Sequence, residues 1–549
     1  MKTSFKALCA GAILGLASLL PAHAAQFVLV NLDPAGVGFN DTTPATPVGG
    51  NPGTTVGEQR IIAYSRALQL WGSVLKSNVP ITVLGSFAPL ACTATGGTLA
   101  QAGAQNVELN FPGAPLAETL YHSALANSIA GMDIYPGVDI IDGADVVAFF
   151  NGSLGSPGCI EGSTWYYGLD SNSPGTQTDF LNVFMHELSH GLGFSNFVSE
   201  VTGNRLGIEC PTNPGFLCRY NDVYMTLTRD NFTGKLWSEL PTALDIRNAA
   251  IRDGQEVWVG PRVTARAPLV LGPATLLRVT SPATVAGDYD FLGGASFGVP
   301  ATSANMTGDV VAATPIDACA PLTNAAAVAG KIAIVRRGTC AFAVKAKTAQ
   351  NAGAVGVIIA NNAPGTGPIG LGGSDPTVVI PAISVGTEAG TTLIGAGTFH
   401  SAGFIVSTTR LAGADAAGHV RLYAPNPVVS GSSGSHFDVV AEPSLLMEPA
   451  ITPLLAASHN VDLTVALFED IGWKTEISIA NCGAGSGSPG TSLTGEIYAA
   501  PIFVCADNAK NKGQFQSCSV HALNDLKKDG IISGATKGNL GTCTAQGGH

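Results

Sequence analysis

The segment FMHELSHGLGF, residues 184–194, decides how the fold and chemistry of this chain are interpreted. It holds His186, Glu187 and His190 in the spacing HExxH. Residues four apart lie on one face of a helix, so the two imidazoles can bind one metal ion with the Glu187 carboxylate beside them. Paired imidazoles suit Zn²⁺, which keeps its other positions for a third ligand and a water molecule. The segment therefore predicts a zinc site built on a helix.

The alternative is a chance pair of histidines in the core of the protein. The chain has ten histidines among 549 residues. In such a chain, HxxxH with Glu in the second place is expected by chance in roughly one case in a hundred or fewer. The preceding residues also argue against chance, because Asp179 is followed by apolar residues at helical spacing. We therefore favour the metal site.

The beginning of the chain indicates export. Residues 1–24 contain Lys2 and Lys6, then an apolar run, and end in AHA, which is the pattern of a secretory signal peptide. Later apolar runs stay below the roughly 20 residues that a membrane-spanning helix needs. We expect a secreted protein, extracellular or periplasmic, without a membrane span.

Cysteine usage agrees with an oxidising compartment. Ten cysteines remain once Cys9 leaves with the signal peptide, and an even number in an exported chain predicts disulfides. A free Cys92 thiolate that blocks zinc is the alternative to a disulfide at that position. The expected pairs are Cys92 with Cys159, Cys210 with Cys218 and Cys319 with Cys340, while cysteines 482, 505, 518 and 543 would staple one small module.

Composition excludes one class of partner. Charged residues make up only 12% of the chain and the formal net charge is −12. Nucleic acid binding needs clustered Lys and Arg to contact phosphates, so we expect no nucleic acid partner. The 68 glycines indicate many turns and strands.

Apolar patterns before the motif indicate strands and helices in alternation. Runs at 27–31, 79–87 and 146–150 predict strands, and the spacing within 58–76 predicts a helix. From 268 onward the character changes, with apolar runs and Gly-rich turns around one helical stretch, 342–351. The predicted division is a signal peptide 1–24, a main domain 25–267, an inserted α/β domain 268–408, the rest of the main domain 409–475, and a linker with a cysteine-containing tail 476–549. We expect an α+β protein whose tail has one clear helix, 514–528.

The inserted segment resembles the protease-associated domain. The resemblance is carried by GKIAIVRRGTCAF at 330–342, then Lys345, residues 353–354 and IPA at 380–382, in the order of that family. It implies a noncatalytic α/β lid or a module that contacts substrate. An ordinary insertion without a role in substrate choice is the alternative.

A zinc site needs a third donor beyond the two motif histidines. In the metzincin pattern HExxHxxGxxH, Gly193 matches the glycine that ends the helix, but the third ligand position falls on Asn196. A neutral amide oxygen is a poor replacement for imidazole on zinc. His436 is the best remaining candidate, because it follows the small-residue run GSSGS at 431–435.

His436 and the later Met447 resemble the leishmanolysin branch of the metzincins. In that branch an insertion separates the glycine from the third histidine, and a Met-turn lies below the metal. The residues DIGW at 470–473 extend the resemblance. It implies a metzincin-like zinc peptidase, split by the inserted domain, with metal ligands His186, His190 and His436. The interval between His190 and His436 is far longer than in an ordinary metzincin.

Other interpretations of these residues stay open. His436 could be a surface loop residue, Met447 could be core filler, and His459 is the second candidate ligand. Four further histidines have no motif around them: His122, His400, His419 and His521.

The residues together predict a secreted zinc-dependent endopeptidase that acts on proteins or peptides. Three imidazoles leave a position on one catalytic zinc ion for water, whose pKa then falls to about 7. Glu187 is the candidate catalytic base, which takes a proton from that water and passes it to the leaving amine. A structural Ca²⁺ ion is compatible with the sequence, but no ligands can be assigned to it.

Two other functions fit parts of the sequence. A catalytically inert secreted binding or adhesion protein would use the protease-associated domain and the cysteine-containing tail, but it has no need of Glu187. A dizinc aminopeptidase also fits a protease-associated domain, yet HExxH is not the signature of those enzymes. Metal content measured together with activity separates these functions.

Overall fold

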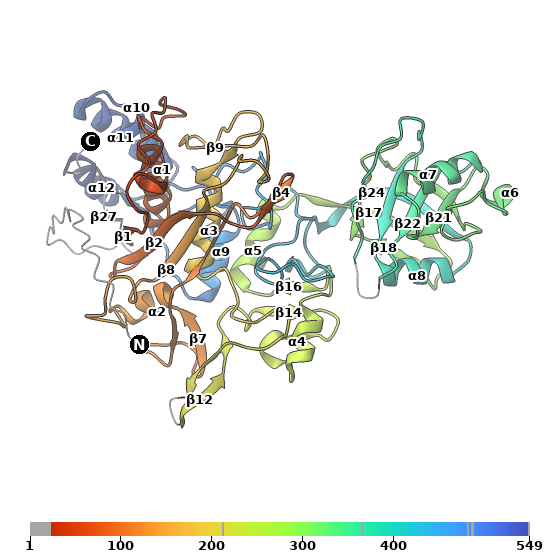
Figure 1. Ribbon diagram of the computed structural model, residues 1–549, viewed down its shortest axis with the longest axis horizontal. Helices are drawn as coiled ribbons and strands as arrows, with labels where there is room; N and C mark the ends of the chain where they lie inside the picture. The colour runs from red at the N-terminus through yellow and green to blue at the C-terminus, as the bar shows by residue number, and fades with distance from the viewer. Residues whose placement is uncertain (1–23, 211–212, 364–366, 480–481, 485–487, 547–549) are drawn as a thin grey trace.

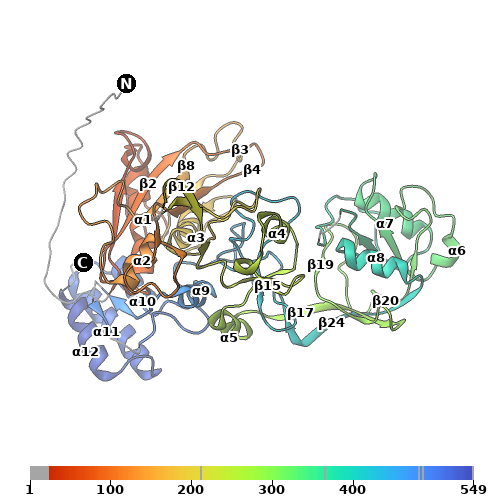
Figure 2. The ribbon, with the colours of Figure 1, turned by 90° about the horizontal axis from the view of Figure 1, so that it is seen from below.

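The computed structural model describes residues 24–210, 213–363, 367–479, 482–484 and 488–546 (Figure 1). Residues 1–23 of the predicted signal peptide lie outside the described residues. The chain forms three parts, which we call the body (24–272 and 412–475), the inserted unit (273–411) and the C-terminal module (476–546). Figures 1 and 2 show the inserted unit projecting from one side of the body, with the C-terminal module on the opposite side.

The body is built on a four-stranded sheet in the order β1-β2-β8-β5. Its strands are β1 (Phe27–Asn31), β2 (Ile81–Ala88), β8 (Val146–Asn151) and β5 (Ala100–Ala104). The first three strands run parallel, whereas β5 runs antiparallel to β8 and forms an edge of the sheet. The outer side of β5 therefore has backbone groups that this sheet does not pair.

Two helices cover one face of this sheet, α1 (Val56–Gly72) and α3 (Phe180–Leu192). Phe150 from β8 contacts the ring of Tyr64 on α1 at 6.0 Å and the ring of Phe184 on α3 at 5.2 Å between centroids. The Phe150 side chain points to a single face of the sheet, so the two helices that it contacts lie on the same face. Tyr64 and Phe184 also stack on each other at 4.1 Å. Aromatic packing thus holds α3 against both α1 and the sheet.

Segments before and after the inserted unit join in a second small sheet. Its order is β15 (Lys235–Leu236), β14 (Thr228–Asp230), β16 (Glu256–Trp258) and β25 (Val420–Arg421). Trp258 pairs with Val420 in this sheet. Farther along, α9 (Thr464–Ile471) ends at Gly472, and the Trp473 indole N–H donates to the Leu192 carbonyl at the end of α3. The body is therefore one structure made from two parts of the chain.

The inserted unit is an eight-stranded mixed sheet with helices. Its strand order is β18-β17-β24-β20-β21-β22-β23-β19. Pro273 at its start is in register with Leu411 at its end, so the chain enters and leaves at adjacent points. The strands are β17 (Pro273–Ser281), β18 (Gly287–Tyr289), β19 (Leu292–Gly293), β20 (Thr307–Ala312), β21 (Ile332–Arg336), β22 (Gly356–Ala360), β23 (Ala382–Val385) and β24 (Phe399–Leu411), and the helices are α6 (Ala325–Val328), α7 (Phe342–Asn351) and α8 (Thr387–Gly395).

The edges of this unit differ slightly from the predicted interval 268–408. Helix α5 (Pro261–Val270) belongs to the body and contains Pro268, so the change in composition precedes the change in structure. Within the unit, α7 covers the residues for which a helix was expected, whereas α6 and α8 were not predicted.

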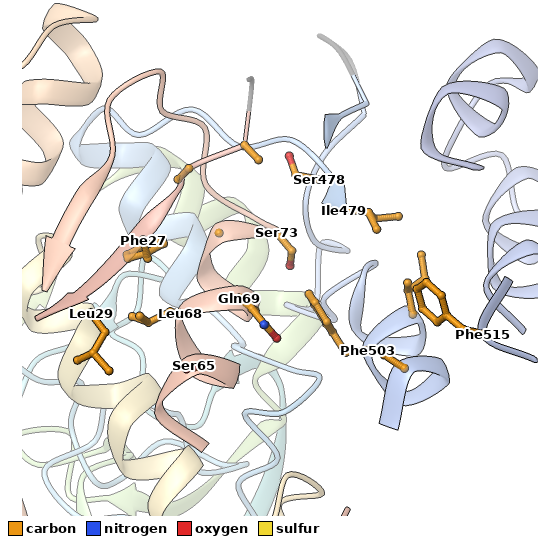
Figure 3. A pocket seen from close by; sticks show the side chains of 15 residues that line it. Phe27, Leu29, Ser65, Leu68, Gln69, Ser73, Ser478, Ile479, Phe503 and Phe515 are labelled. Carbon is orange, nitrogen blue, oxygen red and sulfur yellow. The ribbon is translucent and has the colours of Figure 1, made fainter. Parts of the chain in front are cut away.

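The C-terminal module has three helices among its described residues, α10 (Ala500–Asn508), α11 (Lys512–Lys528) and α12 (Gly534–Gln546). The predicted helix 514–528 corresponds to α11, whereas α10 and α12 were not predicted. Helix α12 contains three glycines, which lower helix propensity and leave little helical pattern in the sequence. Between α1, β1 and the module lies a cavity of about 460 Å³ (Figure 3), whose lining includes Phe27, Leu68, Ile479, Phe503 and Phe515 but none of the motif histidines.

Five disulfides form among the described residues. Every pair expected from the sequence is present, and the module contains the other two bonds. Cys92 is bonded to Cys159, so it is not a free thiolate. Five disulfides fit a secreted or lumenal protein. In the described part of the chain, no helix has the length and apolar character needed to cross a membrane.

Candidate metal centre

Helix α3 positions the two motif histidines. Its N-cap is Asp179, whose carboxylate accepts the Asn182 backbone N–H at 2.8 Å, and every residue of the helix is buried. The helix ends where the sequence predicted, because Gly193 adopts φ = 134°. A Cβ atom there would lie 2.4 Å from the Ile471 Cδ1 atom on α9. Only glycine therefore fits this helix end.

The three predicted histidine ligands meet at one point. The Nε2 atoms of His186 and His190 are 3.1 Å apart, and each lies 3.2 Å from the Nε2 atom of His436. Tetrahedral Zn²⁺ with Zn–N bonds of about 2.0–2.1 Å needs nitrogens about 3.3 Å apart. Among the described residues, these three form the one group of His, Cys, Asp or Glu side chains close enough to share an ion. The group contains no carboxylate, so a structural Ca²⁺ ion stays without assigned ligands.

Backbone carbonyls orient all three imidazoles. The Nδ1 atom of His186 lies 2.7 Å from the Leu446 carbonyl oxygen, and that of His190 lies 2.7 Å from the Phe194 carbonyl oxygen. His436 Nδ1 lies 2.9 Å from a third carbonyl oxygen, that of Ser432. A carbonyl oxygen can only accept, so each Nδ1 carries the hydrogen and each Nε2 keeps its lone pair. Three lone pairs directed at one point suit a metal ion.

Burial keeps these imidazoles neutral. It lowers the pKa of His186 to about 3 and that of His190 to about 4. For His436, burial and then the neighbouring histidines hold the pKa well below its ordinary value. Neutral imidazole is the form that binds metal, so the donor set fits Zn²⁺.

His436 is delivered by a turn and bend, residues 430–436, in the second part of the body. Tyr423 donates its N–H to the His436 carbonyl at 2.9 Å and accepts the Gly434 N–H at 2.8 Å. The Phe437 N–H donates to the Met447 carbonyl at 2.8 Å. The Met447 side chain is fully buried. These backbone hydrogen bonds explain how His436, 246 positions after His190 in the chain, comes to lie beside His190.

Glu187 lies between α3 and the edge strand of the body. Its carboxylate accepts the backbone N–H of Ala102 on β5, and burial raises its pKa to about 8. A nearby divalent cation would lower this pKa, because an opposite charge favours the carboxylate form. Glu187 is therefore the buried acid beside the histidine pair that the motif predicted.

One histidine near the centre was not predicted from the sequence. His122, at the end of β7 (Thr119–His122), is buried, and its Nε2 atom lies 2.8 Å from Ser195 Oγ. Ser195 Oγ in turn donates to the His190 carbonyl at 3.3 Å. Burial, and secondly the proximity of His190, lowers the pKa of His122 to about 3. No local motif marks His122, because its proximity arises only from tertiary contacts between β7 and the segment that follows α3.

The remaining candidates lie outside the cluster. His459 is exposed and contacts Ser458, so the structure does not bring the second candidate ligand to the site. Asn196 is not in the cluster either, but its amide contacts the segment that carries His436. The other histidines with described contacts have different partners, His400 with Asp309, His419 with Asp415 and His521 with the Ser517 carbonyl.

Residues 306–393 match the PA domain family. This part of the chain is therefore a PA domain, which confirms the resemblance of the inserted segment. The match covers most of the inserted unit, from the residue before β20 to α8. It does not extend to the histidine cluster.

Curated proteins share short stretches with this chain. ER degradation-enhancing alpha-mannosidase-like protein 3 of Homo sapiens is 44% identical over 75 residues, 14% of this chain and 8% of that protein. The Xenopus laevis protein of the same name is 36% identical over 114 residues, 19% and 12% of the two chains. Signal peptide peptidase-like 4 of Oryza sativa subsp. japonica is 46% identical over 80 residues, 14% of each. The chain thus spans at most 14% of these relatives.

Solved structures similar to part of this chain are aminopeptidases. A zinc aminopeptidase from Bacillus subtilis has 23% identity and a TM-score of 0.18, covering 27% of this chain and 37% of that chain. An aminopeptidase from Aneurinibacillus sp. strain AM-1 has 22% identity and a TM-score of 0.17, covering 26% and 38%. Scores this low do not relate the overall folds. The leishmanolysin-like fold of the body stays a prediction.

Proposed function

We propose that this protein is a secreted zinc-dependent endopeptidase. The observation that carries the proposal is the triangle of Nε2 atoms from His186, His190 and His436, with separations of 3.1 to 3.2 Å. Zinc bound there would supply a water molecule with a pKa of about 7 and an electrophile for the peptide carbonyl. The five disulfides support export, together with the signal-like residues 1–24.

Glu187 would move the proton in the reaction. Its carboxylate accepts a proton from the attacking water and donates it to the amine that leaves. A peptide nitrogen leaves poorly unless it is protonated, so this transfer assists the difficult step. Because the side chain is buried and held by the Ala102 N–H, it stays in one position during the transfer.

The edge strand β5 supports an extended peptide as the substrate. Ala102 of β5 donates its N–H to Glu187, so that N–H points away from β8 and toward the candidate catalytic group. A substrate in extended conformation would add to this edge as a further strand. Binding through the backbone on both sides of the scissile bond is what an endopeptidase requires, since it cleaves inside a chain.

Activity and metal content test the proposal together. We would measure zinc per chain and hydrolysis of an unfolded protein, with and without a chelator, for the wild type and for Glu187→Ala. The expected result is one zinc per chain and activity that is lost with chelator and in Glu187→Ala. Exposed Glu118→Ala is the matched control that keeps activity. Unaltered activity after chelation or in Glu187→Ala would rule out the mechanism, and zinc without turnover on many substrates would favour an inert binding protein.

A further inference from the structure

The position where a compact metzincin motif would put its third ligand has a different set of contacts. Asn196 lies six residues after His190 in the sequence and points its amide at the segment before His436. Its Nδ2 atom donates to the Gly434 carbonyl at 3.2 Å and to Ser435 Oγ at 3.0 Å. The backbone N–H of Asn196 also donates to Ser435 Oγ, at 3.3 Å.

The orientation of this amide follows from its neighbours. The Asn196 Oδ1 atom accepts the Val198 N–H at 2.9 Å. A flipped amide would place two acceptors together at Gly434 and two donors together at Val198. Asn196 therefore uses both amide hydrogens on the His436 segment and its oxygen on its own turn. This divided set of bonds is specific to an amide, because neither Asp nor Ala could make it.

The receiving segment is shaped for this contact. Gly434 adopts φ = 71°, and a Cβ atom there would lie 2.9 Å from the Trp237 ring and 3.2 Å from Asn196 Nδ2. Glycine thus allows the segment to approach both side chains closely. Ser435 is almost fully buried and directly precedes His436. Any movement of residues 434–435 would move the third imidazole.

We propose that Asn196 is a positioning residue that latches the His436 segment to the end of the motif helix and so sets how tightly zinc is held. The inference rests on the proposed zinc site. His436 comes 246 residues after His190, so no local turn can keep it in place. Asn196 supplies a short connection between the two ligand-bearing segments. A pre-placed third imidazole slows the opening of the site through which zinc would leave.

Zinc release measures the latch without relying on activity. Purified full-length protein would be loaded with zinc, and release to a chromogenic chelator followed for Asn196→Ala, Ser435→Ala and the double variant. We expect Asn196→Ala to weaken zinc binding by about 10- to 100-fold, the range for partners that orient a ligand. Ser435→Ala should act in the same direction. The double variant should release zinc no faster than Asn196→Ala, because both changes remove one shared contact.

Matched variants separate the latch from general destabilisation. Asn231→Ala removes an amide that also ties distant segments, through Asp415 at 3.0 Å, but it does not contact the His436 segment. It should leave zinc release unchanged. Visible spectra of the Co²⁺-loaded proteins should change for Asn196→Ala and not for Asn231→Ala. If Asn196→Ala does not fold, Ser435→Ala alone decides, since it removes only one hydroxyl.

His436→Ala distinguishes a failure of the proposed Asn196 latch from a failure of the proposed zinc site. If His436→Ala weakens zinc binding but Asn196→Ala and Ser435→Ala release zinc at the wild-type rate, the latch is wrong and the zinc site stands. If the wild type binds no zinc, or His436→Ala binds it as tightly as the wild type, the proposed zinc site is wrong and the latch falls with it.

Discussion

At the residue scale, the three imidazoles owe their direction to backbone carbonyls. Leu446, Phe194 and Ser432 each supply one carbonyl oxygen to an Nδ1–H group. A carbonyl oxygen does not titrate, so the tautomer that leaves Nε2 free does not depend on a neighbouring acid. The sequence could predict that histidines are the ligands. It could not predict these carbonyl partners, which come from three separate segments.

Asp179 at the start of α3 gives a prediction for the pH dependence of stability. Burial raises its pKa to about 7 from an ordinary value of 3.8, and the nearby Asp170 carboxylate acts in the same direction. Between these values the folded form binds more protons than the unfolded form, so stability falls as pH rises. From pH 5 to 7 this group should remove about 2 kcal/mol of the free energy of unfolding.

Urea unfolding of metal-free protein at both pH values measures this contribution. Asp179→Asn keeps an acceptor for the Asn182 N–H but does not titrate, so its loss between pH 5 and 7 should be smaller by about the same 2 kcal/mol. Equal losses in the wild type and Asp179→Asn would contradict the assignment.

At the scale of elements, the site depends on how α3 ends and what lies beside it. Gly193 and Gly472 end α3 and α9 with positive φ angles, and the two helix ends are joined through Trp473 and the Leu192 carbonyl. The edge strand β5 then meets Glu187 through Ala102. Two of these features, the helix end and the edge strand, can be tested separately.

Gly193→Ala should destabilise the protein strongly. The new methyl group would meet Ile471 at 2.4 Å and the residue would keep a φ angle of 134°, so we expect a loss of about 2–4 kcal/mol. Gly131→Ala is the matched control, because Gly131 also ends a helix with φ = 68° but has nothing within 4 Å of a Cβ atom. Chemical denaturation should give the larger loss for Gly193→Ala, and equal losses would contradict the steric argument.

Ala102→Pro tests the hydrogen bond that β5 donates to Glu187. The change removes the N–H that Glu187 accepts, on the side of the strand away from β8, where proline is tolerated at sheet edges. We expect kcat/KM to fall at least about tenfold while zinc content is kept, since one charged hydrogen bond is worth about 1.5–3 kcal/mol. Ala102→Val keeps the N–H and is the control for added bulk. Wild-type kcat/KM in the proline variant would show that the Ala102 hydrogen bond to Glu187 has no role in catalysis.

At the scale of the whole molecule, zinc would join parts of the chain that lie on either side of the PA domain. A ligand that binds only the folded protein stabilises it by about 4 kcal/mol at 1,000 times its Kd. The free energy of unfolding of the wild type should therefore be about 4 kcal/mol lower with chelator than with free zinc at 1,000 times its Kd. His436→Ala should respond much less to chelator. An equal response in both proteins would place the stabilising ion elsewhere.

The PA domain should be removable without loss of the metal centre. Pro273 and Leu411 are neighbours in register, so residues 274–410 can be replaced by a linker of about four residues. The deletion takes Asp290 and Phe291 away from Arg421, whose side chain then faces solvent. We expect the shortened body to fold and bind one zinc ion per chain. A soluble body without zinc, beside a full-length protein that binds it, would show that the domain is needed for the site.

Features that depend on neighbouring residues in the sequence were predictable, because the interactions that produce them lie within a short segment. HExxH at 186–190 on a helix, the glycine that ends that helix, the PA domain and the two disulfides between close cysteines, Cys210–Cys218 and Cys319–Cys340, all follow from short segments. The glycine-rich helix α12 and the role of His122 did not follow, since weak propensity and tertiary packing leave no local signal.

By itself, then, the sequence predicted a metal site of paired imidazoles with an acid beside them, and the need for a distant third donor. Only the tertiary structure decided which donor arrives and how it is held. The Nε2 atom of His436 comes within 3.2 Å of both motif histidines because Tyr423, Met447 and Asn196 hold its segment by hydrogen bonds. Such contacts join residues far apart in the chain, and no spacing within a segment can encode them.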